Sequence, residues 1–534
     1  MENKFLRIAQ IDMFAHVSSV EYLESVFKRL SKYGYNAVLL CYRDKFPYTC
    51  YPELTSPDAY TLDEVMRIES IAKENSIEII PLAMQFSHAE AILKHPRFKH
   101  LSSGGLNLLE DASLEVIVRC AEDVLRVHPN VKLVHFGGDE MQGIAADPAC
   151  GRYIREKGAS EYYVQFVNRI ADAMRAHGVR AGIWSDMLIR YPQALPELDK
   201  STVIFYWDYW SYGDRTPFVT IGGGLPDMFM LDFDKLHGDL RKLFITPWVH
   251  PPDEIPCGHL RRFEKYWQMD PEEKSVRSFP YLAWFRDHGL DVIGSMTTYP
   301  EKSSFLPDCL SKFDHVRGFA SRIRESGGAG YLACLWAKFF PLPETCMPSW
   351  ATANEIIDHP EKSDDEICAV ASARLGASWT PNTLKAYLGA GSDFEAADLM
   401  SPLWKNNLAL VERFKWLGKS GELENDMEMC RESLRKVECL LGGEWKNLPA
   451  DSYERFTLED LRWRAKTQIA WNSSDTSAVP SLRKELAELE ARFPAFLNMM
   501  YRKTHHEDIQ TSRYKPWRQL LDDIESGAKQ SEKA

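Results

Sequence analysis

The sequence has 534 residues, of which 45% are hydrophobic and 26% are charged, so it is too long for one small module and can bury a large core. Its 64 lysine and arginine residues against 77 aspartate and glutamate residues give a net charge of −13, which argues against a surface that binds nucleic-acid duplexes. No stretch approaches the ~20 consecutive apolar residues of a membrane-spanning helix, and the first residues show no secretory signal. Eleven cysteines are scattered without a Cys-x-x-Cys pair, as in proteins with reduced thiols, so we expect a cytoplasmic protein.

Short β-rich segments alternate with longer amphipathic segments over the first two thirds of the chain, which is the pattern of βα units. Helices are predicted at residues 19–32, 62–75, 113–127 and 161–177, where apolar residues recur at helical spacing. Eight strands are predicted, at residues 6–13, 36–42, 77–85, 132–136, 180–184, 203–207, 291–295 and 330–336.

Eight βα units predict an α/β protein with a (β/α)8 TIM barrel over residues 1–360, with its functional residues where strands end and loops begin. The gap between the sixth and seventh strands is too long for one helix, so we expect an insertion around residues 210–285. Its proline-rich stretch at 248–256 is predicted to be a loop over the barrel mouth. From about residue 361 only helical patterns follow, so residues 361–534 are predicted to form a C-terminal α-helical domain.

The segment 133–140, Leu-Val-His-Phe-Gly-Gly-Asp-Glu, is the most informative in the chain. A hydrophobic strand ends, two glycines allow a tight turn, and Asp139 and Glu140 follow at the predicted barrel mouth. Neighbouring carboxylates tend to separate their pKa values, which leaves one ionised and one able to act as an acid. An ordinary turn would also use Gly-Gly-Asp, so these residues alone leave a structural and a catalytic interpretation open.

The longer string His-x-Gly-Gly-Asp-Glu after a hydrophobic strand resembles the active-site motif of the family 20 glycoside hydrolases, the β-N-acetylhexosaminidases. Residues 135–140 match it without departure. Residues 81–88 are similar to the family's Pro-Glu-x-Asp-x-Pro-Gly-His, keeping Pro81 and His88 but lacking the acids and the glycine. Details at residues 46–48, 86–88 and 207–209 resemble the intracellular hexosaminidase D branch.

The resemblance implies an exo-acting enzyme that hydrolyses terminal β-linked N-acetylglucosamine or N-acetylgalactosamine with retention, the substrate's 2-acetamido oxygen attacking C1 to form an oxazolinium ion. Asp139 would accept the acetamido N–H, and Glu140 would protonate the leaving oxygen and later deprotonate water. His88 and Asp44 would form a relay that tunes Glu140. No metal or organic cofactor is implied, and the expected partner is a glycan or glycoconjugate.

The resemblance also implies substrate-binding positions. Arg7 matches a first-strand arginine that binds sugar hydroxyls, and His135 belongs to the motif itself. Trp184, Trp207 and Trp336 each end a predicted strand and match the tryptophans that form the family's acetamido pocket.

Two positions bear on which hexosamine is preferred. Tyr299, after the seventh strand, is the candidate counterpart of the family's tyrosine that contacts the acetamido oxygen. Lys338 stands two residues after the last-strand tryptophan, where the family usually has an acid.

Two other functional interpretations stay open. An ordinary two-carboxylate glycosidase would use Asp186 or Glu301 as its nucleophile. A barrel that binds amino sugars without cleaving them would have no need of a general acid.

The His-His-Glu-Asp segment at 505–508 lacks metal-ligand spacing and is predicted to be a solvated helix face. A homodimer is one option for the helical domain.

Overall fold

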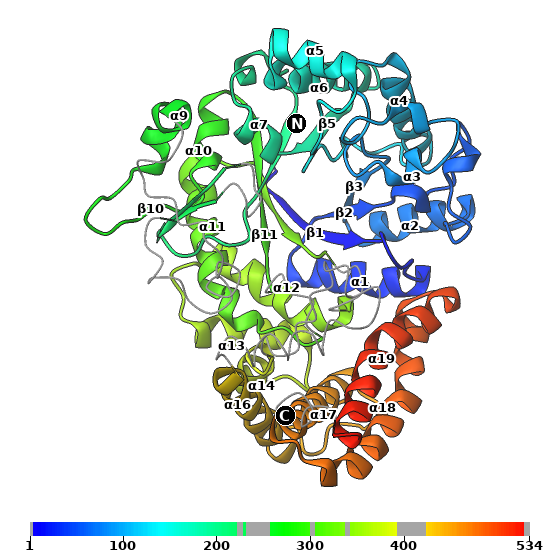
Figure 1. Ribbon diagram of the computed structural model, residues 1–534, viewed down its shortest axis with the longest axis vertical. Helices are drawn as coiled ribbons and strands as arrows, with labels where there is room; N and C mark the ends of the chain where they lie inside the picture. The colour runs from blue at the N-terminus through cyan, green and yellow to red at the C-terminus, as the bar shows by residue number, and fades with distance from the viewer. Residues whose placement is uncertain are drawn as a thin grey trace.

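The structure is a computed structural model that describes residues 4–221, 228–230, 257–299, 305–336, 342–391 and 423–527. At its centre, eight parallel strands close into a barrel in the order β1-β12-β11-β6-β5-β4-β3-β2, which confirms the predicted TIM barrel (Figure 1). The strands are β1 (Leu6–Asp12), β2 (Ala37–Cys41), β3 (Glu78–Leu82), β4 (Leu133–His135), β5 (Arg180–Trp184), β6 (Val203–Trp207), β11 (Asp291–Thr297) and β12 (Gly330–Cys334).

Side chains of the barrel strands alternate between two apolar layers, because successive residues of a strand point to opposite faces. Ile8, Leu39 and Ile80 belong to the cluster that fills the barrel interior. Val38 and Leu40, on either side of Leu39, face the outer helices instead. Both faces of the barrel strands are therefore largely buried.

The first outer helix shows how the local sequence sets its own boundaries. Ser19 caps α1 (Val20–Tyr33) by accepting a hydrogen bond from the backbone N–H of Tyr22, and Gly34 ends the helix with a φ of 96°. The apolar stripe predicted for this helix is buried against the barrel. The other helices between or after the barrel strands are α2 (Leu62–Glu74), α3 (Glu90–Leu93), α4 (Asp111–Val127), α5 (Pro148–Lys157), α6 (Ala159–Arg175), α7 (Asp186–Arg190), α9 (Cys257–Trp267), α10 (Tyr281–Asp287), α11 (Phe313–Ser326) and α12 (Pro343–Asp358).

The connection between β6 and β11 contains two small sheets in addition to α9 and α10. β7 (Arg215–Thr216) pairs with β10 (Val276–Arg277), and β8 (Phe218–Thr220) pairs with β9 (Met228–Met230), both antiparallel. The predicted proline-rich loop at 248–256 lies outside the described residues.

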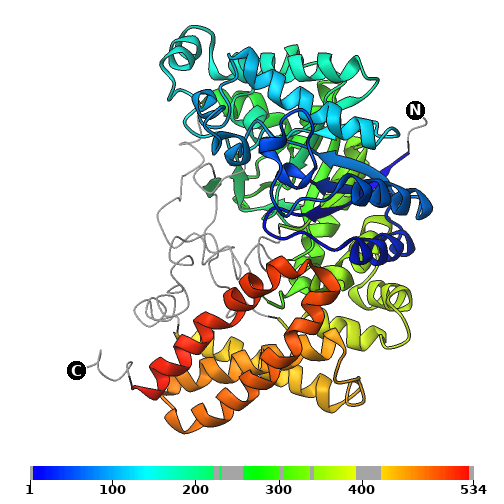
Figure 2. The same cartoon turned by 90° about the vertical axis from the view of Figure 1, so that its right-hand side faces the viewer.

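The predicted C-terminal helical region is present and lies against one side of the barrel (Figures 1 and 2). It contains α13 (Asp364–Leu375), α14 (Pro381–Leu388), α16 (Leu423–Gly442), α17 (Tyr453–Ser473), α18 (Val479–Met500) and α19 (His506–Glu525). The end of α18 reaches the β1–α1 connection, where the backbone N–H of Ser19 donates to the carbonyl oxygen of Met500 at 3.0 Å. Among the described helices, none has the length and apolar character needed to cross a membrane.

The start of α19 corrects one sequence prediction. His505 is buried, and its Nε2 lies 3.2 Å from Asp58 Oδ2 in the loop after β2. His16 Nε2, after β1, lies 3.5 Å from Asp508 Oδ2. The segment predicted to be a solvated face therefore contacts two barrel loops, because the chain turns back onto the barrel after α18.

Candidate active site

The turn after β4 brings two acids to the carboxyl end of the barrel. Gly137 and Gly138 have φ angles of 76° and 93°, in the left-handed region that favours glycine. A Cβ atom at Gly137 would overlap the side-chain amide of Gln85, and one at Gly138 would lie 2.5 Å from Tyr163 Oη. Only glycine lets this turn pack against the segment after β3 and against α6.

A histidine beyond β3 contacts both acids. His88 Nε2 lies 3.4 Å from Asp139 Oδ2 and 3.3 Å from Glu140 Oε2. Ser87 Oγ donates to Asp139 Oδ1 at 2.8 Å and accepts from the backbone N–H of Gly138 at 2.7 Å. The Asp139 side chain is 14% exposed and the Glu140 side chain is 48% exposed. Asp139 is therefore largely enclosed by the protein, whereas Glu140 reaches solvent.

The charges of these groups are coupled. Hydrogen bonding to Asp139 and then to Glu140 raises the pKa of His88 to about 10, so the imidazole is protonated at neutral pH. Burial alone would raise the pKa of Asp139, but the hydrogen bond and charge of His88 and the hydroxyl of Ser87 hold it below its usual value. Asp139 is therefore an ionised hydrogen-bond acceptor at neutral pH.

A third carboxyl group lies beneath the turn. Asp186, the first residue of α7, accepts from the backbone N–H of Glu140 at 2.7 Å and from Trp207 Nε1 at 3.2 Å. Glu140 has a φ of 50°, which is uncommon for a residue other than glycine, and the bond to Asp186 helps hold it there. Burial, followed by the charge of Asp139, raises the pKa of Asp186 to about 8. Sequence reasoning named Asp186 only as an alternative nucleophile and missed this supporting position.

The three predicted tryptophans converge at the carboxyl ends of β5, β6 and β12. The ring centroids of Trp184 and Trp336 lie 5.7 Å apart, and those of Trp207 and Tyr209 lie 5.3 Å apart. Trp336 Nε1 donates to Tyr209 Oη at 2.8 Å and so joins the two pairs. We call these four residues the aromatic cluster. Tyr209 was missed as a site residue, although it follows a strand-ending tryptophan by two positions.

Tyr299 lies at the edge of the aromatic cluster, because its buried hydroxyl accepts from the backbone N–H of Trp336 at 2.8 Å. Lys338 and the alternative nucleophile Glu301 lie outside the described residues.

Arg7 lies at the opposite end of the barrel, which contradicts its predicted contact with sugar hydroxyls. It is the second residue of β1, and its Nη1 donates to Asn354 Oδ1 and Asp358 Oδ2, both at 2.8 Å, near the end of α12. Since parallel strands direct their carboxyl ends to the site, the first residues of β1 face away from it.

His135 supports the turn from below instead of reaching the barrel mouth, where the resemblance placed it among the substrate-binding residues. It is fully buried, its Nδ1 accepts from the backbone N–H of Gly137 at 3.0 Å, and its ring centroid lies 4.5 Å from that of Trp184. Burial lowers the pKa of His135 to about 3, so the imidazole is neutral.

Asp44 has different partners from those predicted. Its Oδ2 accepts from Lys94 Nζ at 3.3 Å, and Lys45 Nζ lies 3.7 Å from its Oδ1. The Nδ1 of His88 is 4.0 Å from Glu90 Oε1. Within the described part of the chain, no hydrogen bond or ion pair joins Asp44 to His88, so the predicted relay is not formed.

Arg43 is a cation at the barrel mouth that sequence reasoning missed. It follows β2 with a φ of 48°, and its guanidinium lies 4.5 Å from the ring centroid of Phe14. With its amide oxygen turned toward the guanidinium, Gln85 accepts from Arg43 Nε at 2.7 Å and from Nη2 at 2.9 Å. Because Gln85 packs against Gly137, Arg43 is tied to the turn that carries the acids.

The acids and histidine also have the ligand types of a metal site, since one ligand atom each from His88, Asp139 and Glu140 lies within 4.8 Å of the others. A metal-binding imidazole must be neutral, whereas the two acids favour protonated His88. That the site works without a metal stays a prediction.

Comparison with known proteins agrees with the sequence resemblance. Residues 44–216 match the family model described as glycosyl hydrolase family 20, catalytic domain. Human hexosaminidase D is 29% identical over 220 residues, which are 38% of this chain and 45% of the human protein. The bovine protein is 27% identical over 220 residues, 38% of this chain and 63% of that protein. The chain thus spans about half the length of the curated relatives it matches.

Solved structures of similar proteins include a β-N-acetylhexosaminidase from Bacteroides fragilis, which is 17% identical with a TM-score of 0.44 and covers 66% of this chain and 65% of that one. An exo-β-N-acetylglucosaminidase from Vibrio harveyi is 16% identical with a TM-score of 0.44, covering 69% of this chain and 57% of that one. The matched segment contains the acids, His88, Asp186 and Trp207, and the predicted resemblance is confirmed: over residues 44–216 the chain is similar to the catalytic domain of glycosyl hydrolase family 20.

Proposed function

We propose that this protein is an exo-acting β-N-acetylhexosaminidase that removes terminal β-linked N-acetylglucosamine or N-acetylgalactosamine with retention. The observation that carries the proposal is the pair Asp139 and Glu140, both in contact with His88, on a turn beside the aromatic cluster. One acid is largely buried and the other is half exposed, so the two can serve different parts of one substrate. The family match over residues 44–216 supports the same reaction class.

In this mechanism the substrate's acetamido oxygen attacks C1. Ionised Asp139 accepts the acetamido N–H, which orients that group and stabilises the positive charge that develops on the oxazolinium ion. Glu140, the more exposed acid, protonates the glycosidic oxygen as it leaves and then takes a proton from the attacking water. His88 holds the two carboxylates at a fixed separation and compensates part of their charge.

The aromatic cluster supplies the surface that an acetamido methyl group requires. Trp184 and Trp207 are nearly fully buried, whereas Trp336 is partly exposed, so Trp336 presents the cluster's accessible face. A sugar with a plain 2-hydroxyl would leave this apolar surface unfilled and would provide no nucleophile. Arg43, in place of Arg7, is the cation proposed to bind outer hydroxyls of the sugar.

The two-carboxylate alternative loses support at Asp186. Both of its oxygens accept hydrogen bonds, one from Glu140 and one from Trp207, and the side chain is buried. A nucleophile needs an oxygen that can reach C1, so this carboxyl is better suited to hold the turn.

The test is a panel of chromogenic β-N-acetylglucosaminide, β-N-acetylgalactosaminide and β-glucoside substrates, assayed with and without a chelator. We expect hydrolysis of one or both N-acetylhexosaminides, competitive inhibition by a thiazoline mimic of the oxazolinium ion, and no loss of rate with the chelator. Comparable rates on the glucoside would contradict substrate assistance and favour the two-carboxylate mechanism. Binding of the sugars with no hydrolysis of any substrate would favour the non-catalytic alternative.

A further inference from the structure

Two cysteines that the proposed hydrolysis does not use lie next to each other on the outside of the barrel. Cys50, in the loop after β2, places its Sγ 4.0 Å from the Sγ of Cys120 on α4, although 70 positions separate them in the chain. Cys120 is buried, whereas Cys50 is only partly buried. One thiol of the pair is therefore accessible from outside and the other is not.

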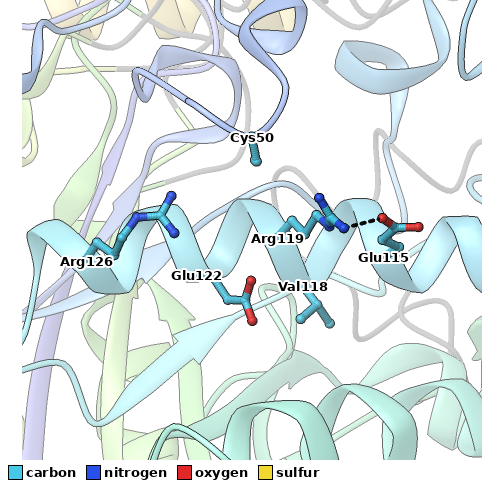
Figure 3. Close-up of a pocket in the computed structure, with 6 residues that line it drawn as sticks. All are labelled: Cys50, Glu115, Val118, Arg119, Glu122 and Arg126. Carbon is cyan, nitrogen blue, oxygen red and sulfur yellow. Dashed lines mark ion pairs between the residues drawn. The ribbon is translucent and has the colours of Figure 1, made fainter.

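Cys50, which carries the accessible thiol, lines a cavity of about 430 Å³ (Figure 3). The cavity is lined by Cys50, Glu115, Val118, Arg119, Glu122 and Arg126. Figure 3 shows Cys50 facing α4, with Arg119 and Arg126 along the helix on either side of it. A small polar molecule such as a hydroperoxide fits a space of this size and polarity.

The surroundings give the two thiols different acidities. A hydrogen bond with Cys120 outweighs burial and, with the backbone N–H of Tyr51 and the charge of Arg126, lowers the pKa of Cys50. Burial raises the pKa of Cys120 well above its usual value. Cys50 is thus suited to attack an oxidant, and Cys120 is suited to stay a thiol beside it.

The loop is already fixed on the helix before any reaction. Asp123 on α4 accepts from the backbone N–H of Thr49 at 2.6 Å and from that of Cys50 at 2.8 Å. A disulfide bond is about 2.05 Å long, so the sulfur atoms must approach by roughly 2 Å, which side-chain rotation of the loop residue can supply.

We propose that Cys50 and Cys120 are a hydroperoxide-reactive pair that forms an intramolecular disulfide between the β2–α2 loop and α4. The Cys50 thiolate attacks one peroxide oxygen, the O–O bond breaks, and an S–O bond forms while hydroxide leaves and takes up a proton to become water. The Cys120 sulfur then attacks Cys50 Sγ, the S–O bond breaks, and the thiol proton leaves with the hydroxyl as a second water. The two sulfurs lose two electrons in total, and the peroxide is reduced to two waters.

The experiment treats the reduced full-length protein with hydrogen peroxide, blocks the remaining thiols and maps the cysteines by mass spectrometry. We expect a peptide pair joined through Cys50 and Cys120 that reductant separates. In Cys120→Ser the reaction should stop at a sulfenic acid on Cys50, which dimedone captures, and Cys50→Ser should give neither product.

Cys439 on α16 is the matched control, because its thiol is exposed but it lies outside this pair. Cys439→Ser should leave the product and its rate unchanged. The proposal is overturned if wild-type Cys50 stays reduced while Cys439 is oxidised, or if Cys50 oxidises without Cys120 becoming joined to it. No sugar substrate is used, so this result is independent of the proposed hydrolase activity.

Discussion

His88, Asp139 and Glu140 form a group in which one imidazolium faces two carboxylates, and the proposed roles of the acids depend on that balance. The more buried acid keeps its charge because His88 and Ser87 stabilise the ionised form. Single substitutions should therefore separate orientation of the nucleophile from proton transfer.

Asp139→Asn and Glu140→Gln should fail in different ways. Loss of a positioned acid–base group typically lowers the rate ~10²–10⁴-fold, and a leaving group that needs little protonation should partly rescue Glu140→Gln. A good leaving group cannot restore the oriented acetamido group that Asp139→Asn loses. Rates measured across a series of aryl leaving groups check this, and equal responses of the two variants would show that the roles are wrongly assigned.

His88→Gln should lower kcat more than it raises KM and should also weaken the fold in a pH-dependent way. The pKa of His88 is about 10 in the folded protein against an ordinary value of 6.5, so the folded state binds the proton more tightly. The contribution of protonated His88 to the stability of the fold is complete below about pH 6.5 and is lost as the pH rises through about 10. The Tm difference between wild type and variant should therefore shrink from neutral pH to about pH 10.5.

Asp44→Asn separates the predicted relay from the contacts in the structure. If Asp44 acted through His88, Asp44→Asn should lower kcat in the same way as His88→Gln but to a smaller extent. The lysine partners of Asp44 predict instead that kcat and its pH profile do not change. A shifted pH profile in Asp44→Asn would show that the relay forms during turnover.

Asp186→Asn should lower kcat while its relative stability improves with rising pH. The variant amide cannot accept hydrogen bonds from both Glu140 and Trp207, so the turn loses its support. The pKa of Asp186 is raised to about 8, so its contribution to wild-type stability is present at low pH and is lost as the pH rises through about 8. Between about pH 6 and 9, the kcat of the variant should stay below that of wild type, while its Tm relative to wild type should rise. An unchanged kcat would remove Asp186 from the positioning of Glu140.

At the scale of elements, the β4 turn is the feature on which the site depends. Gly138→Ala forces a side chain into a residue with a φ of 93° and against Tyr163, whereas Gly178→Ala meets a similar backbone, with a φ of 68°, but no atom within 4 Å. The control variant Gly178→Ala should lower the unfolding free energy by about 1–2 kcal/mol, because of backbone strain alone. Gly138→Ala should cost a further ~1–3 kcal/mol from overpacking and should also lower kcat, as measured by urea unfolding and initial rates. Equal losses in the two variants would show that the turn has room for a side chain.

At the scale of the whole molecule, the helical region is tied to the barrel by Arg502. Its guanidinium donates to the carbonyl oxygens of Asp58 and Ala59, both at 2.9 Å, and to Glu64 at 2.6 Å. Arg502→Met should lower the unfolding free energy by about 1.5–3 kcal/mol, because it leaves acceptors at a partly buried contact without their charged donor.

Arg67→Met is the matched control for that contact. Arg67 pairs with Glu24 at 3.1 Å, and both side chains are about half exposed, so its loss should cost about 0–1 kcal/mol. Chemical unfolding and limited proteolysis between the barrel and α16–α19 measure both variants. If Arg502→Met matches the control, the helical region is held by its other contacts with the barrel instead.

What the sequence determined by itself was local. The strand positions, the glycine turn before Asp139 and the tryptophans near the ends of strands follow from residues within a few positions of one another, and periodicity and turn chemistry report such neighbours. The eight predicted strands are all present, though the third ends at Leu82 because the chain then leaves the barrel wall to carry Ser87 and His88.

Tertiary structure alone decided which distant groups meet. Closure of the barrel brings Asp186 to the backbone of Glu140 across 46 positions and leaves Arg7 at the far end with Asp358. The path of the chain after α18 returns His505 to the loop after β2, and the packing of that loop on α4 sets Cys50 beside Cys120. These contacts depend on strand register, helix packing and the path of the chain through space, and no pattern of neighbouring residues encodes them.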